Sequence, residues 1–127
     1  MIKKLSMMTQ EEKQLLLKDL CAKLLYGVIC KLSAKDADVS ITEKLGLGGL
    51  EHFIFGTMDV LPYLRPMSSM TEEEKKKVHY FVESHKFGNC SRSGAISDYL
   101  NSIHVDYRGL IPMGLALEAT EGMYKTE

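Results

Sequence analysis

Residues 9–32 read TQEEKQLLLKDLCAKLLYGVICKL, and this stretch predicts a helix followed directly by a strand. Thr9 and Glu12 have the spacing of a capping box, in which each side chain accepts a hydrogen bond from the other residue's amide. The leucines that follow recur at helical spacing, and Gly27 stands where the helix is expected to end. Residues 28–32 are short, apolar and partly β-branched, so they predict a strand.

The same signals organise the rest of the chain. Thr71 and Glu74 repeat the capping box, and residues 96–103 place apolar side chains at helical spacing. Residues 46–49 contain three glycines and are expected to break any regular element. The expected helices span residues 10–25, 72–86 and 94–104, and the expected strands span residues 28–32, 39–41, 52–55 and 58–61. Together they predict an α+β fold with about three helices packed on a small antiparallel sheet.

The length of the chain, 127 residues, is typical of one domain. We expect this domain to cover residues 9–119, with residues 1–8 as an N-terminal extension and residues 120–127 as a flexible C-terminal tail. The apolar pieces between residues 110 and 117 are expected to dock on the core as short extended segments.

The composition narrows the class of protein. Lys and Arg total 16 against 17 Asp and Glu, which argues against a dedicated, basic nucleic-acid-binding domain. The three cysteines are odd in number and form no Cys-x-x-Cys pair, which indicates a reducing compartment and predicts a cytoplasmic protein. No apolar run approaches the roughly 20 residues that span a bilayer, so no membrane segment is expected.

Three parts of the chain carry a resemblance to a known family. They are residues 9–21 (TQEEKQLLLKDLC), residues 63–71 (YLRPMSSMT), and a late stretch made of residues 106–111 (DYRGLI), 114–119 (GLALEA) and 121–124 (EGMY). These blocks cover about half of the chain. They resemble a family of short proteins of unknown function from gut Bacteroides genomes and their phages or mobile elements.

The resemblance implies a phage or mobile-element context and a bacterial cytoplasm, and it brings no activity, ligand or catalytic residue with it. Family members begin at the position of Met8, so both Met1 and Met8 are candidate starts. Residues 27–60 and 86–98 match the family poorly, and these segments are therefore expected to carry the specificity of this member.

No motif predicts a catalytic residue, a metal site or a cofactor. His79 and His85 are six residues apart, which is about 240° around a helix, so they cannot share one face. Residues 46–49 (GLGG) lack the Lys and Ser/Thr of a phosphate-binding loop. Cys90 lies in a polar loop beside Arg92, which could lower its pKa, but no partner His is identifiable.

Binding residues are better indicated. Leu16 and Leu20 belong to a leucine arc wider than one core contact needs, which fits either a partner or dimer interface or a helix buried on two sides. Two aromatic–arginine pairs, typical of interface anchors, lie in turn-like segments. These pairs are Tyr107 with Arg108, and Tyr63 with Arg65 between two prolines. The alternative for each arginine is a structural role, donating to chain carbonyls.

Three functions remain open. The first is a non-enzymatic protein-binding or regulatory accessory protein, whose partner is a host or phage protein or a second copy of the chain. The second is a nucleic-acid-binding regulator, which needs a cluster of basic residues such as Lys75, Lys76, Lys77, Lys86 and Arg92. The third is a small enzyme whose site is assembled only by the fold.

Overall fold

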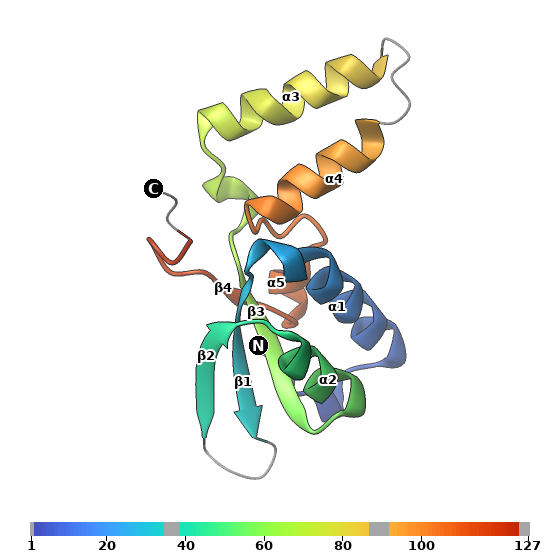
Figure 1. Cartoon of the computed structure of the whole chain (residues 1–127), viewed down its shortest axis with the longest axis vertical. Helices are drawn as coiled ribbons and strands as arrows, with labels where there is room; N and C mark the ends of the chain where they lie inside the picture. Colours follow the sequence, from blue (N-terminus) through green and yellow to red (C-terminus); the bar gives the residue numbers. More distant parts are fainter. Residues whose placement is uncertain (1, 35–38, 87–91, 125–127) are drawn as a thin grey trace.

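The fold is a four-stranded sheet with helices packed beside it and a helical hairpin at one end (Figure 1). The computed structural model describes residues 2–34, 39–86 and 92–124, with the backbone alone at 84–86 and 92–94. Its elements are η1 (Leu5–Met7), α1 (Gln10–Lys23), η2 (Leu24–Tyr26), β1 (Ile29–Ala34), β2 (Ser40–Lys44), α2 (Leu47–Phe55), β3 (Met58–Leu64), η3 (Met67–Ser69), α3 (Glu72–Lys86), α4 (Arg92–Ser102), α5 (Leu110–Met113) and β4 (Leu117–Glu118).

The sheet confirms the α+β class but is mixed rather than antiparallel. Its strand order is β2-β1-β3-β4. β1 pairs antiparallel with both β2 and β3, whereas β4 runs parallel to β3. The chain reaches β4 only after the α3–α4 hairpin and α5, and this long return lets β4 lie parallel to β3. The expected antiparallel sheet is therefore correct for three of the four strands.

Both predicted capping boxes are present. The Thr9 hydroxyl accepts from the amide of Glu12 at 3.1 Å, and the Glu12 carboxylate accepts from the amide of Thr9 at 2.9 Å. Thr71 and Glu74 make the same reciprocal bonds at 3.2 and 2.8 Å. The predicted bounds of the second helix, residues 72–86, are confirmed by α3, and Gly27 adopts the left-handed conformation expected after the first helix.

The segment around α2 corrects the prediction for residues 46–55. The expected glycine break and the expected strand at 52–55 are both wrong, because residues 47–55 form one helix. A Cβ placed on Gly49 would lie 3.1 Å from Leu45 Cδ1 and 3.3 Å from Leu32 Cδ2. The glycine therefore lets α2 approach the sheet closely, and this packing outweighs the low helix propensity of glycine.

The N-terminal residues are part of the fold rather than an extension. Leu5 and Met8 are buried in the main core. The amide of Leu5 donates to the Asp59 carboxylate at 2.8 Å, and the amide of Lys3 donates to the Gly114 carbonyl at 2.8 Å. The expectation of a separate extension at residues 1–8 failed because these few apolar side chains give no periodic signal.

The C-terminal residues 120–124 are likewise held in place. The Tyr124 hydroxyl donates to the Tyr63 carbonyl and accepts from the Ile29 amide, both at 2.7 Å. Within the expected flexible tail, Tyr124 is thus bonded to β1 and β3, while residues 125–127 lie outside the described chain. Residues 110–113, expected to be extended, form the short helix α5.

The buried apolar side chains form two separate clusters. The larger one fills the space between the sheet, α1 and α2, and the smaller one, built on Met70, Leu100 and Val105, lies at the base of the α3–α4 hairpin. Figure 1 shows this hairpin projecting along the longest axis, away from β1 and β2. Among the described residues, no helix has the length and apolar character to cross a membrane.

Candidate functional site

A buried polar network joins α1 to the turn at Tyr107 and Arg108. Arg108 donates to the Asp19 carboxylate at 2.7 Å, and its guanidinium lies 4.6 Å from the centre of the Tyr107 ring. The Lys23 ammonium lies over the same ring at 5.0 Å. The turn predicted to anchor a partner therefore directs both of its side chains to groups within its own chain.

Asp19 and Lys23 form the centre of this network. Their ion pair is fully buried, and Lys23 also donates to the Asn101 side chain on α4 at 3.0 Å. Burial lowers the pKa of Lys23, while the neighbouring Asp19 carboxylate opposes this shift. One Asp19 oxygen, Oδ2, has no hydrogen-bond partner among the described groups. The network fixes α1 against α4, and it leaves little surface for a ligand.

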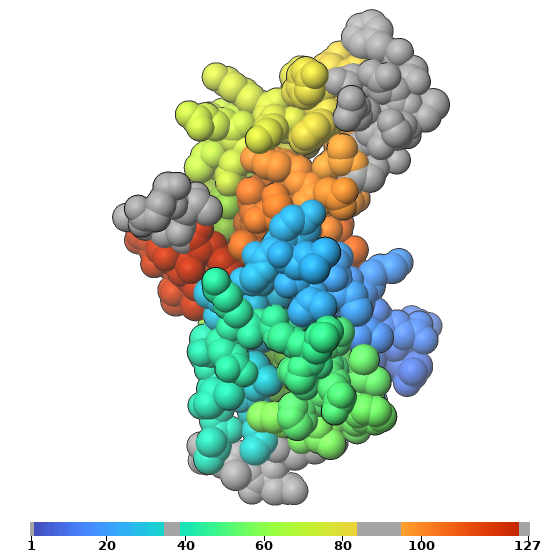
Figure 2. Space-filling view, viewed as in Figure 1, coloured from blue at the N-terminus to red at the C-terminus, as the bar shows by residue number. Residues whose placement is uncertain are grey.

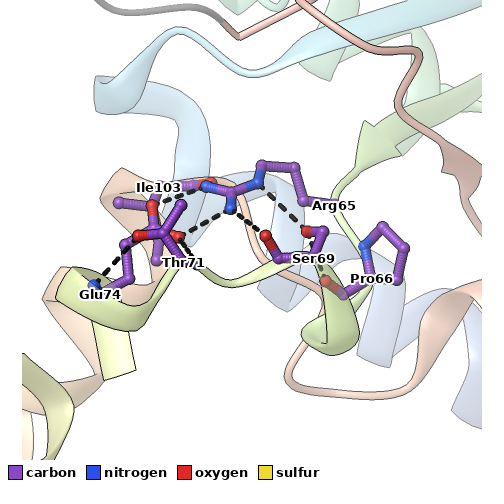
Figure 3. Close-up of polar contacts among 6 residues, drawn as sticks. All are labelled: Arg65, Pro66, Ser69, Thr71, Glu74 and Ile103. Carbon is purple, nitrogen blue, oxygen red and sulfur yellow. Dashed lines mark hydrogen bonds and ion pairs between the residues drawn. The ribbon is translucent and has the colours of Figure 1, made fainter. Parts of the chain in front are cut away.

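The second predicted anchor, Arg65, is also satisfied from within the chain (Figure 3). Arginine has five N–H donors. Arg65 directs them to both carboxylate oxygens of Glu74 at 2.7 and 2.9 Å, to the hydroxyl and carbonyl of Ser69 at 3.3 and 3.0 Å, and to the Ile103 carbonyl at 3.3 Å. These hydrogen bonds from Arg65 are the main cause that lowers the pKa of Glu74. Arg65 clamps β3 to the hairpin and has no donor left for a partner.

A hollow of about 430 Å³ lies beside this clamp, between η3 and the C-terminal segment. Arg65, Ser69, Glu121 and Tyr124 contribute to its walls, and none of its lining residues is His or Cys. Tyr63, the aromatic partner predicted for Arg65, is half-buried in β3 and offers its carbonyl to Tyr124. Arg65, Ser69 and Tyr124 are therefore already engaged in hydrogen bonds within the chain.

The leucines of α1 are core residues. Leu16 and Leu20 have no exposed surface, so neither side chain is available to a partner while the domain is folded. Leu15 and Leu17, on either side of Leu16, are partly buried and pack against the same core. The wide leucine arc thus corresponds to the alternative interpretation, a helix covered on more than one side.

α2 carries several apolar side chains that are largely exposed to solvent. The sequence did not predict a helix here. Leu47, Ile54 and Phe55 are 76%, 57% and 73% exposed. On a helix these positions lie along one outward face together with Glu51. We call this the α2 surface (Leu47, Glu51, Ile54 and Phe55). α2 itself lies on the front of the molecule in Figure 2, in green, below the blue residues of α1.

A shallow hollow of about 150 Å³ adjoins the α2 surface, where α2 meets the start of α1. Its apolar walls include Leu17, Phe53 and Ile54, and Lys13 contributes a positive charge to its rim. A space of this volume holds about one benzene-sized group, so it can receive a single apolar side chain.

The described residues contain no cluster of three His, Cys, Asp or Glu side chains able to hold a metal ion. Burial raises the pKa of the Cys30 thiol to about 12, and Cys90 lies outside the described residues. His104 stacks on Tyr124 at 3.8 Å, bonds the Tyr26 carbonyl through Nε2 at 2.7 Å, and has its pKa lowered by burial. Its contacts are those of a packing residue.

The basic cluster required for nucleic-acid binding is offset by acidic residues. Lys75, Lys76 and Lys77 are exposed on α3, but this helix holds four Lys and four Glu. Lys75 pairs with Glu72 at 3.4 Å, and Lys77 lies over the Tyr99 ring at 5.1 Å. The side chains of Lys86 and Arg92 lie outside the described part.

Comparisons with known proteins add no relative. No family model matches the chain, and searches of curated proteins and of solved structures give no match.

Proposed function

We propose that this chain is a non-enzymatic protein-binding accessory protein and that the α2 surface is its contact site. One observation carries the proposal: α2 is apolar on nearly every side, yet Leu47, Ile54 and Phe55 are largely exposed. Helices that are apolar all round are normally buried. Contiguous exposed apolar patches mark interaction sites in soluble proteins.

The surroundings of the α2 surface indicate the kind of partner. The hollow beside Ile54 receives one large apolar side chain, and Lys13 on its rim favours a carboxylate next to that side chain. Fully burying a Leu, Ile or Phe side chain contributes about 1.5–3 kcal/mol. Three such residues can anchor a contact with a helix or loop of a partner protein, and neighbouring residues must supply the rest of the interface.

The biological setting is part of the same proposal. The resemblance of residues 9–21, 63–71 and 106–124 to proteins of phages and mobile elements supports a role as an accessory protein in a bacterial cytoplasm. The partner is then a host or phage protein. Because residues 27–60 contain α2 and match the family poorly, the contact would be specific to this member.

Photo-crosslinking in cells that encode the chain tests the proposal. A photoreactive residue replaces Leu47 in one variant and His79, exposed on α3, in another. We expect a discrete protein adduct from position 47 and none from position 79. The adduct at position 47 should disappear when Ile54→Asp is added. It should persist when Ser97→Asp, an exposed control on α4, is added instead. Equal adducts from both positions, or none from position 47, would contradict the proposal, provided that circular dichroism shows folded variants.

A further inference from the structure

β2 is an edge strand with a free side. Each of its residues, 40–44, is exposed, and among the described strands it pairs only with β1. Natural edge strands are commonly protected by charged side chains, proline, a bulge or a covering loop, and of these β2 has the charges of Glu43 and Lys44. β2 contains no proline and its register with β1 is continuous over all five residues. The strand is therefore open to pairing on its outer side.

The register shows which peptide groups point outward. The Leu45 amide donates to the Val28 carbonyl at 2.8 Å, and the Ala34 amide donates to the Val39 carbonyl at 3.1 Å. In an antiparallel pair, residues whose peptide groups point toward the partner alternate with residues whose groups point away. Ser40, Thr42 and Lys44 therefore direct their N–H and C=O groups away from β1. Within the described chain, no hydrogen bond to these outer groups is formed.

We propose that a second copy of this chain occupies this edge, pairing β2 antiparallel with β2 of the copy about a twofold axis through Thr42. In this register Thr42 faces Thr42 of the copy, and Ser40 of each chain faces Lys44 of the other. All three outward residues of each strand are then paired, with six hydrogen bonds in total. The edge is thus complementary to itself.

Charge selects this register over its neighbours. With the axis at Thr42, Glu43 lies beside Ile41 of the copy, and no like charges face each other. An axis at Glu43 would place two glutamates directly opposite, which destabilises a strand pair. An axis at Ile41 would leave Lys44 without a partner in residues 39–44. Thr–Thr pairs across strands are favourable, so the Thr42 axis is preferred.

The pairing also covers apolar surface. Ile41 is half-exposed and lies on the same sheet face as Leu32, against which α2 packs through Gly49. An adjoining strand from the copy would cover Ile41. Because the axis is perpendicular to the sheet, both α2 helices would lie on the same face of the joined sheet. This inference comes from the β2 edge alone and does not depend on what the α2 surface binds.

The interface is short, so the dimer should depend on concentration. Five strand residues span about 17 Å, and the contact would be smaller than the roughly 800 Å² per partner of a standard interface. Sedimentation velocity of the full chain, from micromolar to near-millimolar protein, is the appropriate assay.

Charge-exchange variants identify the axis. Thr42→Asp and Thr42→Lys each place like charges across it and should weaken self-association roughly tenfold, whereas an equal mixture of the two should restore it. Ser68→Asp, exposed on η3 and remote from β2, should behave as the unmodified chain. A monomer at every concentration, as expected if the edge serves a foreign strand or none, overturns the proposal. So does unchanged dimerisation of the Thr42 variants, or a mixture that associates no better than either variant alone.

Discussion

The buried ion network makes a quantitative prediction for Asp19→Asn. Asp19 is the shared carboxylate of two cations, Lys23 and Arg108, and both contacts end on its Oδ1. The substitution keeps the shape of the side chain but removes its charge. Lys23, which has no exposed surface, would then lose its ion-pair partner and keep only neutral contacts, namely the Asn101 oxygen, the Tyr107 ring and the introduced amide, next to a second cation.

Removing one partner of a buried ion pair typically costs about 3–5 kcal/mol. Natural domains of this size are stable by about 5–15 kcal/mol in total, so Asp19→Asn removes a large share. Lys23→Met should cost less, because Asp19 keeps Arg108 at 2.7 Å. The loss in Asp19→Asn should also shrink as the pH rises toward 10.5, the ordinary pKa of lysine, because Lys23 can then give up its proton.

Urea unfolding followed by circular dichroism measures these differences, since the chain contains no tryptophan. With a slope of about 1–3 kcal/mol per molar, the midpoint of Asp19→Asn should fall by roughly 2 M. Glu72→Gln, which removes an exposed pair with Lys75, should change stability by less than about 1 kcal/mol. A midpoint for Asp19→Asn within error of the unmodified chain, or a larger loss for Lys23→Met, would refute the reasoning.

Three other substitutions have expected outcomes in the same unfolding assay. Tyr124→Phe leaves the Ile29 amide without its acceptor and should cost about 1–3 kcal/mol; no loss would mean that the C-terminal segment is not held by this hydroxyl. Glu74→Gln should cost about 1.5–3 kcal/mol at neutral pH. Because the folded pKa of Glu74 is lowered, this difference should begin to shrink as the pH falls below 4.5 and should vanish once the pH is below the folded pKa; a constant difference would argue against the Arg65 clamp. Gly48→Ala, with open space at its Cβ, should stabilise α2 by about 0.5–1 kcal/mol, whereas Gly49→Ala should destabilise it by about 1 kcal/mol; equal effects would contradict the packing of α2.

Local signals predicted the elements that local chemistry determines. The two capping boxes and the charge order of α3 are encoded within a few residues, so α1 and α3 were placed correctly. α2 was missed because its helical state depends on a contact with the sheet, made at Gly49 by Leu32 and Leu45. A short apolar run such as residues 52–55 does not distinguish a strand from a buried helix by periodicity.

The α2 surface was not predicted from the sequence, because residues 46–55 were expected to form a glycine break and a strand, whereas the buried polar network was predicted in part. Tyr107 and Arg108 were identified as a pair worth attention, and the structure shows that they serve a buried network. The signal for that network was present: Asp19 and Lys23 are four residues apart on a helix otherwise rich in leucine. Their burial could not be inferred, because it depends on Asn101 and Arg108, which are distant in sequence.

The claim that α2 carries the contact surface is tested most directly by amide hydrogen exchange of this chain. Exchange is measured with and without the partner protein identified by crosslinking at position 47. We expect slower exchange in residues 47–55 and unchanged exchange in α3. Slowing confined to the α3–α4 hairpin, or unchanged exchange throughout α2, would contradict it.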